Sequence, residues 1–221
     1  MQRLRFLLFL ALAASCGAQW DPLTPVTEVQ QQPDGALLHM QSGVMKVQVC
    51  TDSIIRVLYS PTSSFPVRPD YVVTKTTWPS AQWKMQSASD EVSLTTGRLK
   101  VTVNRADGGI VYSDLSGNAL LRDGEKRMTP VTVNGEQTYR AELPFSIYAS
   151  KEAFYGLGQQ QAGVWNYRGE SVDLSQDNTI VAVPLLVSTK GYGLFWNNTS
   201  RSRFNSRFAQ SIVIAIVGVL M

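Results

Sequence analysis

Short segments in which apolar and polar residues alternate recur along most of the chain. Such alternation indicates strands, because successive side chains of a strand point to opposite faces of a sheet. The segments span 44–49, 53–59, 83–86, 99–103 and 145–148. Turn signals that contain glycine separate them, at 33–35, 108–109, 116–118, 122–124 and 133–135. No sustained helical period occurs outside the first 18 residues, so the pattern predicts an all-β fold, an antiparallel β-sandwich.

The start of the chain has the features of an export signal. Two arginines precede an apolar run over 6–14, and small residues follow up to Ala18. The run is about half the roughly 20 residues that a membrane-spanning helix needs. We therefore expect a signal peptide over 1–18, no transmembrane span, and a periplasmic or extracellular product. Residues 13–16 also resemble a bacterial lipoprotein box, so a lipid anchor on Cys16 stays open.

Two further segments differ from the alternating body of the chain. Residues 19–32 are mostly polar and contain two prolines, so we expect an extended lead-in before a sandwich over 33–208. Residues 209–221 are almost entirely apolar and too short to span a bilayer. They fit either a buried strand or an aggregation-prone tail. We favour the interpretation that the natural reading frame was lost near Phe208, or that the chain was cut short.

Composition removes several classes of function. Lys and Arg number 20 against 17 Asp and Glu, and they are scattered, which argues against a nucleic-acid partner. One histidine and two cysteines are too few for a zinc or iron–sulfur site, and there is no phosphate-binding glycine loop. We therefore expect no cofactor and no metal. Cys50 has no expected intrachain partner and is predicted to be a small buried hydrophobe in a strand.

Residues suited to sugar binding gather late in the chain. Trp165, Asn166, Tyr167 and Arg168 place two aromatic rings, an amide and a guanidinium side by side. Aromatic faces stack on the C–H surfaces of sugars, and polar groups bond the hydroxyls. The alternative is that Trp165 and Tyr167 only cover the end of the sandwich.

A second polar cluster, Asp177, Asn178 and Thr179, combines a carboxylate, an amide and a hydroxyl in a predicted loop. These side chains suit sugar hydroxyls, but they also suit a turn in which they bond their own backbone. Buried strands are predicted next to them, over 181–188 and 192–196. The residues alone leave both interpretations open.

Five short segments follow one another in the second half of the chain: Tyr155-Gly-Leu-Gly-Gln, Asn166-Tyr-Arg-Gly, Asp177-Asn-Thr, Val183-Pro and Lys190-Gly-Tyr-Gly. Their order resembles the N-terminal β-sandwich domain of glycoside hydrolase family 31, above all its bacterial α-xylosidase and α-glucosidase members. The resemblance implies a galactose-mutarotase-like supersandwich that packs against a (β/α)8 barrel. It also implies that a loop near Asp177, Asn178 and Thr179 contacts the substrate, and we add Trp165 and Arg168 as candidate substrate-binding residues.

The resemblance also implies that the catalytic residues lie elsewhere. Family members are retaining glycosidases with two aspartates on the barrel, and retention needs carboxyl groups about 5–5.5 Å apart. Too few residues follow Phe204 for a barrel of about 250 residues. Asp173 and Asp177 would be roughly 13 Å apart on an extended strand, too far for such a pair. Mutarotases need a catalytic histidine, and His39 lies in no matching motif. We therefore predict no catalytic residue in this chain.

Three functions remain. We favour the non-catalytic N-terminal part of an exported retaining α-glycosidase, whose partners are an α-linked oligosaccharide and the absent barrel. The alternatives are a free-standing carbohydrate-binding module, with or without a lipid anchor, and an interaction protein with no glycan role. The sequence does not identify the sugar.

Overall fold

The computed structural model describes residues 25–66, 70, 72–75, 77–79, 81–124, 126–147, 151–207 and 211–219. Within these residues every helix or strand element is a β-strand, which confirms the all-β prediction. The strands are β1 (Val26–Gln32), β2 (Gly35–Met40), β3 (Val44–Val49), β4 (Ile55–Ser60), β5 (Lys84–Ser87), β6 (Glu91–Thr95), β7 (Leu99–Asn104), β8 (Ile110–Asp114), β9 (Ala119–Asp123), β10 (Arg127–Val133), β11 (Glu136–Ser146), β12 (Phe154–Gln159), β13 (Ser171–Leu174), β14 (Val181–Ser188), β15 (Gly193–Phe195), β16 (Ser202–Asn205) and β17 (Ser211–Val219). No helix in this part of the chain is long and apolar enough to cross a membrane.

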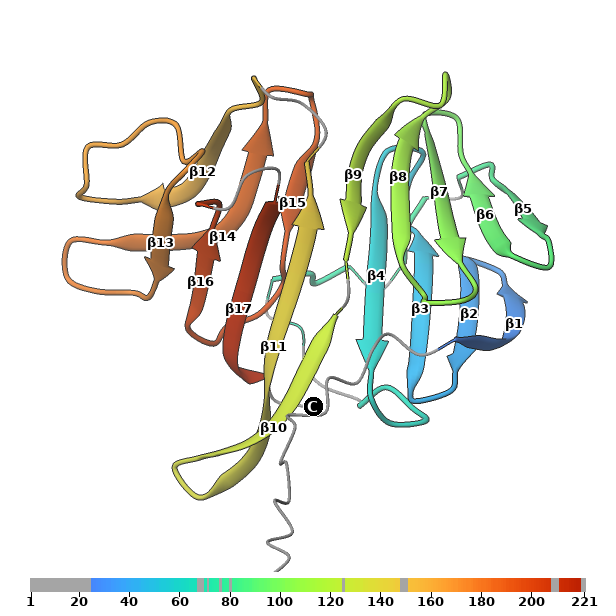
Figure 1. The fold of residues 1–221 in the computed structure, drawn as a ribbon, viewed down its shortest axis with the longest axis horizontal. Coiled ribbons are helices and arrows are strands. Elements are labelled where there is room, and N and C mark those ends of the chain that lie inside the picture. Colours follow the sequence, from blue (N-terminus) through green and yellow to red (C-terminus); the bar gives the residue numbers. More distant parts are fainter. Residues whose placement is uncertain are drawn as a thin grey trace, which may run out of the picture.

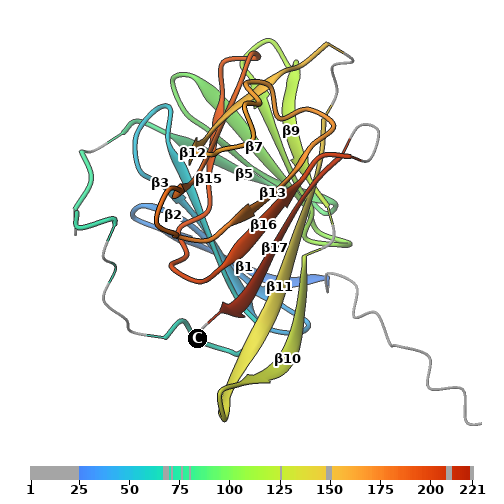
Figure 2. The same ribbon diagram turned by 90° about the vertical axis from the view of Figure 1, so that its left-hand side faces the viewer.

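Three antiparallel sheets build two layers (Figure 1). One layer is a long sheet in the order β13-β16-β17-β11-β9-β8-β7-β6-β5, with β10 paired to β11. The other layer consists of a four-stranded sheet, β1-β2-β3-β4, and a three-stranded sheet, β12-β14-β15. Both smaller sheets cover the same face of the long sheet, one over each half (Figure 2). This arrangement is the supersandwich that the family resemblance implies.

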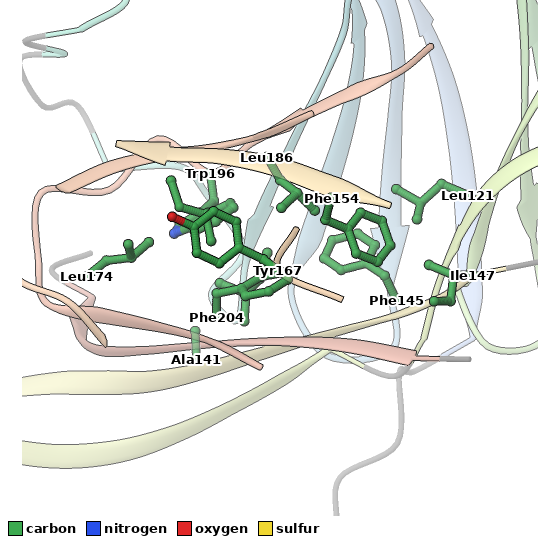
Figure 3. Close-up of a cluster of buried hydrophobic side chains, with 12 residues drawn as sticks. Leu121, Ala141, Phe145, Ile147, Phe154, Tyr167, Leu174, Leu186, Trp196 and Phe204 are labelled. Carbon is green, nitrogen blue, oxygen red and sulfur yellow. The ribbon is translucent and has the colours of Figure 1, made fainter. Parts of the chain in front are cut away.

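Each half of the molecule has its own hydrophobic core. The first core lies under the four-stranded sheet and includes Leu38, Met45, Val47, Leu94, Val101 and Ile110. The second core lies under the three-stranded sheet and includes Phe145, Phe154, Leu186, Trp196 and Phe204 (Figure 3). Tyr112 of β8 packs against both cores. The halves of the long sheet join where β9 pairs with β11 at Asp123 and Arg122.

The N-terminal boundary of the sandwich needs a correction. Residues 26–32, expected as part of a lead-in, form β1 and pair with β2 from Val26 to Gln32. β1 is an edge strand in which Val26 and Val29 contact the first core and the other five residues are polar, so it gives little hydrophobic signal in the sequence. Residues 1–24 lie outside the described part of the chain, so the signal peptide and a lipid anchor on Cys16 stay predictions.

The apolar C-terminal segment is a strand. β17 lies inside the long sheet and pairs with β11 on one side and β16 on the other. Ile214 is fully buried in the second core. The structure thus favours the buried-strand interpretation of 211–219 over a loose tail, and the expected loss of reading frame stays a prediction.

Cys50 is fully buried, as expected, but it lies directly after β3 and not within a strand; among the described residues it forms no disulfide. Burial raises the pKa of its thiol, which disfavours the reactive thiolate. His39 lies next to the last residue of β2, where its carbonyl oxygen accepts a hydrogen bond from the hydroxyl of Thr27. Both residues therefore belong to the scaffold of the first half.

Candidate functional site

The loop that carries the aromatic cluster begins at a kink in β12. Gly156, Leu157 and Gly158 all have positive φ, at 100°, 62° and 86°. The kink interrupts the pairing of β12 with β14 over three residues of β14, including Pro184. A proline fits there because its missing N–H costs no ladder hydrogen bond. Two of the family-like segments, the glycine pair and the proline, therefore form one structural feature, which buries Leu157 and directs the chain into the loop over 160–169.

Asn166 and Arg168 hold this loop against the start of β12. Asn166 Oδ1 accepts hydrogen bonds from the backbone N–H of Phe154 at 3.1 Å and of Arg168 at 3.0 Å. Arg168 Nη1 donates to the carbonyl oxygen of Glu152 at 2.7 Å. Tyr167 is buried in the second core, which agrees with the interpretation that it covers the sandwich end (Figure 3). Most of this segment therefore shapes the loop.

Trp165 differs from its neighbours because 86% of its surface is exposed. Large aromatic side chains are rarely so open on a folded domain. The indole offers an apolar face with a polar N–H edge, which suits stacking on a sugar ring.

Asp177, Asn178 and Thr179 form an exposed turn between β13 and β14. The backbones of Asp177 and Ile180 exchange two hydrogen bonds of 3.3 Å, which close the turn. Asp177 Oδ1 accepts a hydrogen bond from the backbone N–H of Asn178 at 2.7 Å. Asp177 thus stabilises its own turn, as one of the two interpretations predicted. All three side chains are also exposed, so they remain accessible to a ligand.

A shallow pocket of about 230 Å³ lies where the loop, β13 and the turn meet. Its lining includes Gln160, Gln161, Tyr167, Glu170, Asp173 and Ile180. The loop over 160–169 and the Asp177–Thr179 turn, both predicted from the sequence as candidate sugar-binding segments, therefore border the same pocket. The candidate residues Trp165, Arg168 and Asp177–Thr179 do not themselves line it. Typical ligand pockets enclose roughly 300–1,000 Å³. This pocket can cover only part of an oligosaccharide.

Asp173, at the edge of this pocket, is neutralised by arginines. Arg203 binds it through two hydrogen bonds of 2.6 and 3.0 Å, and Arg201 lies 3.6 Å away. The hydrogen bonds from Arg203 hold the pKa of Asp173 below its usual value. Because a general acid needs a raised pKa, this environment opposes a proton-donating role. Asp173 instead joins β13 to β16.

A buried polar cluster around Glu152 was not predicted from the sequence. Glu152 also anchors the loop, because its carbonyl oxygen accepts the hydrogen bond from Arg168. Ser188 Oγ donates a hydrogen bond to Oε1 of the buried Glu152. Burial, reinforced by neighbouring Glu152, raises the pKa of Tyr192 far above its usual value. Lys190 Nζ donates to the carbonyl oxygen of Ala119 in β9 at 2.8 Å. The Lys190-Gly-Tyr-Gly turn therefore connects the three-stranded sheet to the long sheet. Within the described ranges, no group of three His, Cys, Asp or Glu is placed to hold a metal ion.

Comparison with known proteins identifies the family in which this architecture occurs. The model of the glycosyl hydrolase 31 N-terminal galactose mutarotase-like domain matches residues 44–205. An α-xylosidase from Saccharolobus solfataricus is 28% identical over 180 residues, which cover 76% of this chain and 24% of that protein. The crystal structure of a GH31 α-xylosidase from Xanthomonas citri matches with a TM-score of 0.71 and 30% identity, over 80% of this chain and 20% of the other.

More distant structures share the fold. A GH31 dextranase from Flavobacterium johnsoniae superposes with a TM-score of 0.73 at 19% identity, over 88% of this chain and 25% of that one. The chain thus spans about a quarter or less of the length of these relatives. Both the sequence resemblance and the supersandwich prediction are confirmed, and the chain belongs to the N-terminal galactose mutarotase-like domain family of the family 31 glycoside hydrolases.

Proposed function

We propose that this chain is the non-catalytic N-terminal sandwich of an exported retaining α-glycosidase. In this role it presents the Asp177–Thr179 turn to an α-linked oligosaccharide held mainly by a separate (β/α)8 barrel. The observation that carries the proposal is the exposed turn beside a pocket too small for the whole ligand. Family membership supports it, because the relatives contain this sandwich as a fifth to a quarter of a much longer chain.

The residues of the turn position the substrate and do not cleave it. The Asp177 carboxylate accepts hydrogen bonds from sugar hydroxyls, and the Asn178 amide and Thr179 hydroxyl add further bonds. Hydrogen bonds to a charged group contribute about 1.5–3 kcal/mol. Arg168, which we expected to contact sugar, is assigned to loop support because its guanidinium donates to Glu152.

A chimera tests this role. We would replace the matching sandwich of the Xanthomonas citri α-xylosidase by this chain and assay hydrolysis of an α-xyloside. The chimera is expected to be active and the isolated chain inactive. Asp177→Ala should raise KM roughly 10- to 100-fold with little change in kcat, since it removes binding common to the ground state and the transition state.

Asp114→Ala is the matched control for this experiment. Asp114 is the last residue of β8, at the start of another turn, where its Oδ1 accepts a hydrogen bond from the backbone N–H of Asn118 at 2.8 Å. Its loss should leave KM unchanged. An active chimera whose KM does not respond to Asp177→Ala would contradict the proposed substrate contact.

The exposure of Trp165 favours one alternative, a free-standing carbohydrate-binding module. Calorimetric titration of the isolated chain with xyloglucan or malto-oligosaccharides separates the two functions. A sandwich that needs its barrel gives no binding heat at millimolar sugar. Heat that disappears in Trp165→Ala would support the module instead.

A further inference from the structure

The outer face of the three-stranded sheet is apolar, although it faces solvent. Along β14, Leu186 is buried and Ala182 packs against the second core, so the alternate residues point outward. We define the outer apolar face as Val181, Val183, Leu185 and Val187 of β14, Phe195 of β15 and Tyr155 of β12. These side chains are 37% to 47% exposed. Phe195 lies opposite Leu185, and Tyr155 lies opposite Val187, so the face is continuous across three strands.

The four-stranded sheet shows that this is not a general property of the fold. It covers the other half of the long sheet in the same way, but polar and charged residues interrupt its outer face. His39, Lys46, Gln48 and Arg56 occupy outward positions there beside Leu37 and Leu58. Strands buried on both faces form nearly continuous apolar runs, as β14 does. The sequence of β14 is therefore that of a strand covered on both sides.

We infer that the outer apolar face is the surface on which the catalytic domain of the same family 31 enzyme docks. This inference rests on the proposed function. The face contains no charged side chain, so it fits an apolar partner surface and offers no site for an acidic or basic ligand. Exposed apolar patches of this kind mark interaction sites.

The position of the face identifies the catalytic domain, and not a second copy, as the partner. Only Ile180 separates the turn Asp177–Thr179 from Val181, the first residue of the face. A domain seated on the face would therefore lie next to the turn that is proposed to reach its substrate. The relatives also contain three quarters or more of their length outside the matched sandwich, which supplies such a partner.

Cysteine alkylation in the chimera described above tests the docking surface. Val183→Cys places a thiol on the face, and Gln86→Cys places one on the exposed strand β5 in the other half. Rates are measured peptide by peptide, and the native Cys50 is buried. Fusion to the catalytic part should slow alkylation at position 183 at least tenfold and leave position 86 unchanged. Equal rates at position 183 in the isolated chain and the chimera would overturn the inference.

Hydrolysis by the chimera is scored separately. An active chimera without protection at position 183 overturns the docking face and leaves the proposed function standing. An inactive chimera counts against the proposed function, and protection at position 183 then still supports the face.

The isolated chain provides a second measurement by sedimentation. Loose, concentration-dependent association that Leu185→Asp abolishes supports an uncovered docking surface. A defined dimer that protects position 183 overturns the inference, because a second copy is then the occupant.

Discussion

Gly158→Ala should lower the free energy of unfolding by about 3 kcal/mol or more. Gly158 has φ of +86°, where a side chain costs about 1–3 kcal/mol. A Cβ atom there would lie 1.9 Å from the carbonyl oxygen of Val181 and 2.8 Å from the backbone nitrogen of Val183. Both contacts are with the backbone of β14, which cannot turn away as a side chain can. Relief requires β12 and β14 to separate, which adds to the cost. Urea denaturation followed by circular dichroism measures the loss.

Gly117→Ala isolates the steric part of this effect. Gly117 also has φ of +86°, but a Cβ atom there would meet nothing within 4 Å. Its substitution should cost only the dihedral strain, about 1–3 kcal/mol, without the added steric cost. Equal losses in the two variants would show that β12 and β14 separate at no cost, and would contradict the tight contact at the kink.

The alternating strands could be predicted because one of their faces lies in a core. The segment 44–49 coincides with β3, and 99–103 matches all but the last residue of β7. Prediction failed where a strand contributes little to a core: of β10, only Met128 packs against the second core. β10 is paired only to β11, and its Pro130 and exposed threonines hide the period. The strand predicted at 145–148 overlaps only the end of β11, which begins at Glu136 and ends at Ser146; Tyr148 lies outside the described residues.

The candidate site could be located from the sequence but not explained by it. The order of the family-like segments identified both the loop and the turn that meet at the pocket. The roles of single residues depended on contacts between segments far apart in the chain. Arg168 bonds a carbonyl 16 positions earlier, and Ser188 bonds Glu152 across 36 positions. The spacing of residues along the chain does not reveal such long-range pairs. The sequence alone could therefore not distinguish an arginine that binds sugar from one that supports a loop.

Phe204→Ala should cost about 3–5 kcal/mol, the usual loss for a phenylalanine removed from a core. Phe204 is fully buried in β16, and its ring meets that of Phe154 edge-on, with centroids 6.4 Å apart and planes at 71° (Figure 3). The pair joins the long sheet to the three-stranded sheet. A double-mutant cycle with Phe154→Ala should give a coupling energy of about 0.5–1.5 kcal/mol by urea denaturation.

Phe195→Ala is the control, because Phe195 is 39% exposed on the outer apolar face. In the isolated chain its loss should change the free energy of unfolding by less than about 1 kcal/mol. Comparable losses for Phe204→Ala and Phe195→Ala would contradict the assignment of Phe204 to the second core. In the chimera, Phe195 would instead be covered by the docked domain, so its truncation should become costly there while the cost of Phe204→Ala stays the same. The two substitutions thus distinguish the aromatic core that stabilises the sandwich from the outer apolar face that is proposed to bind the catalytic domain.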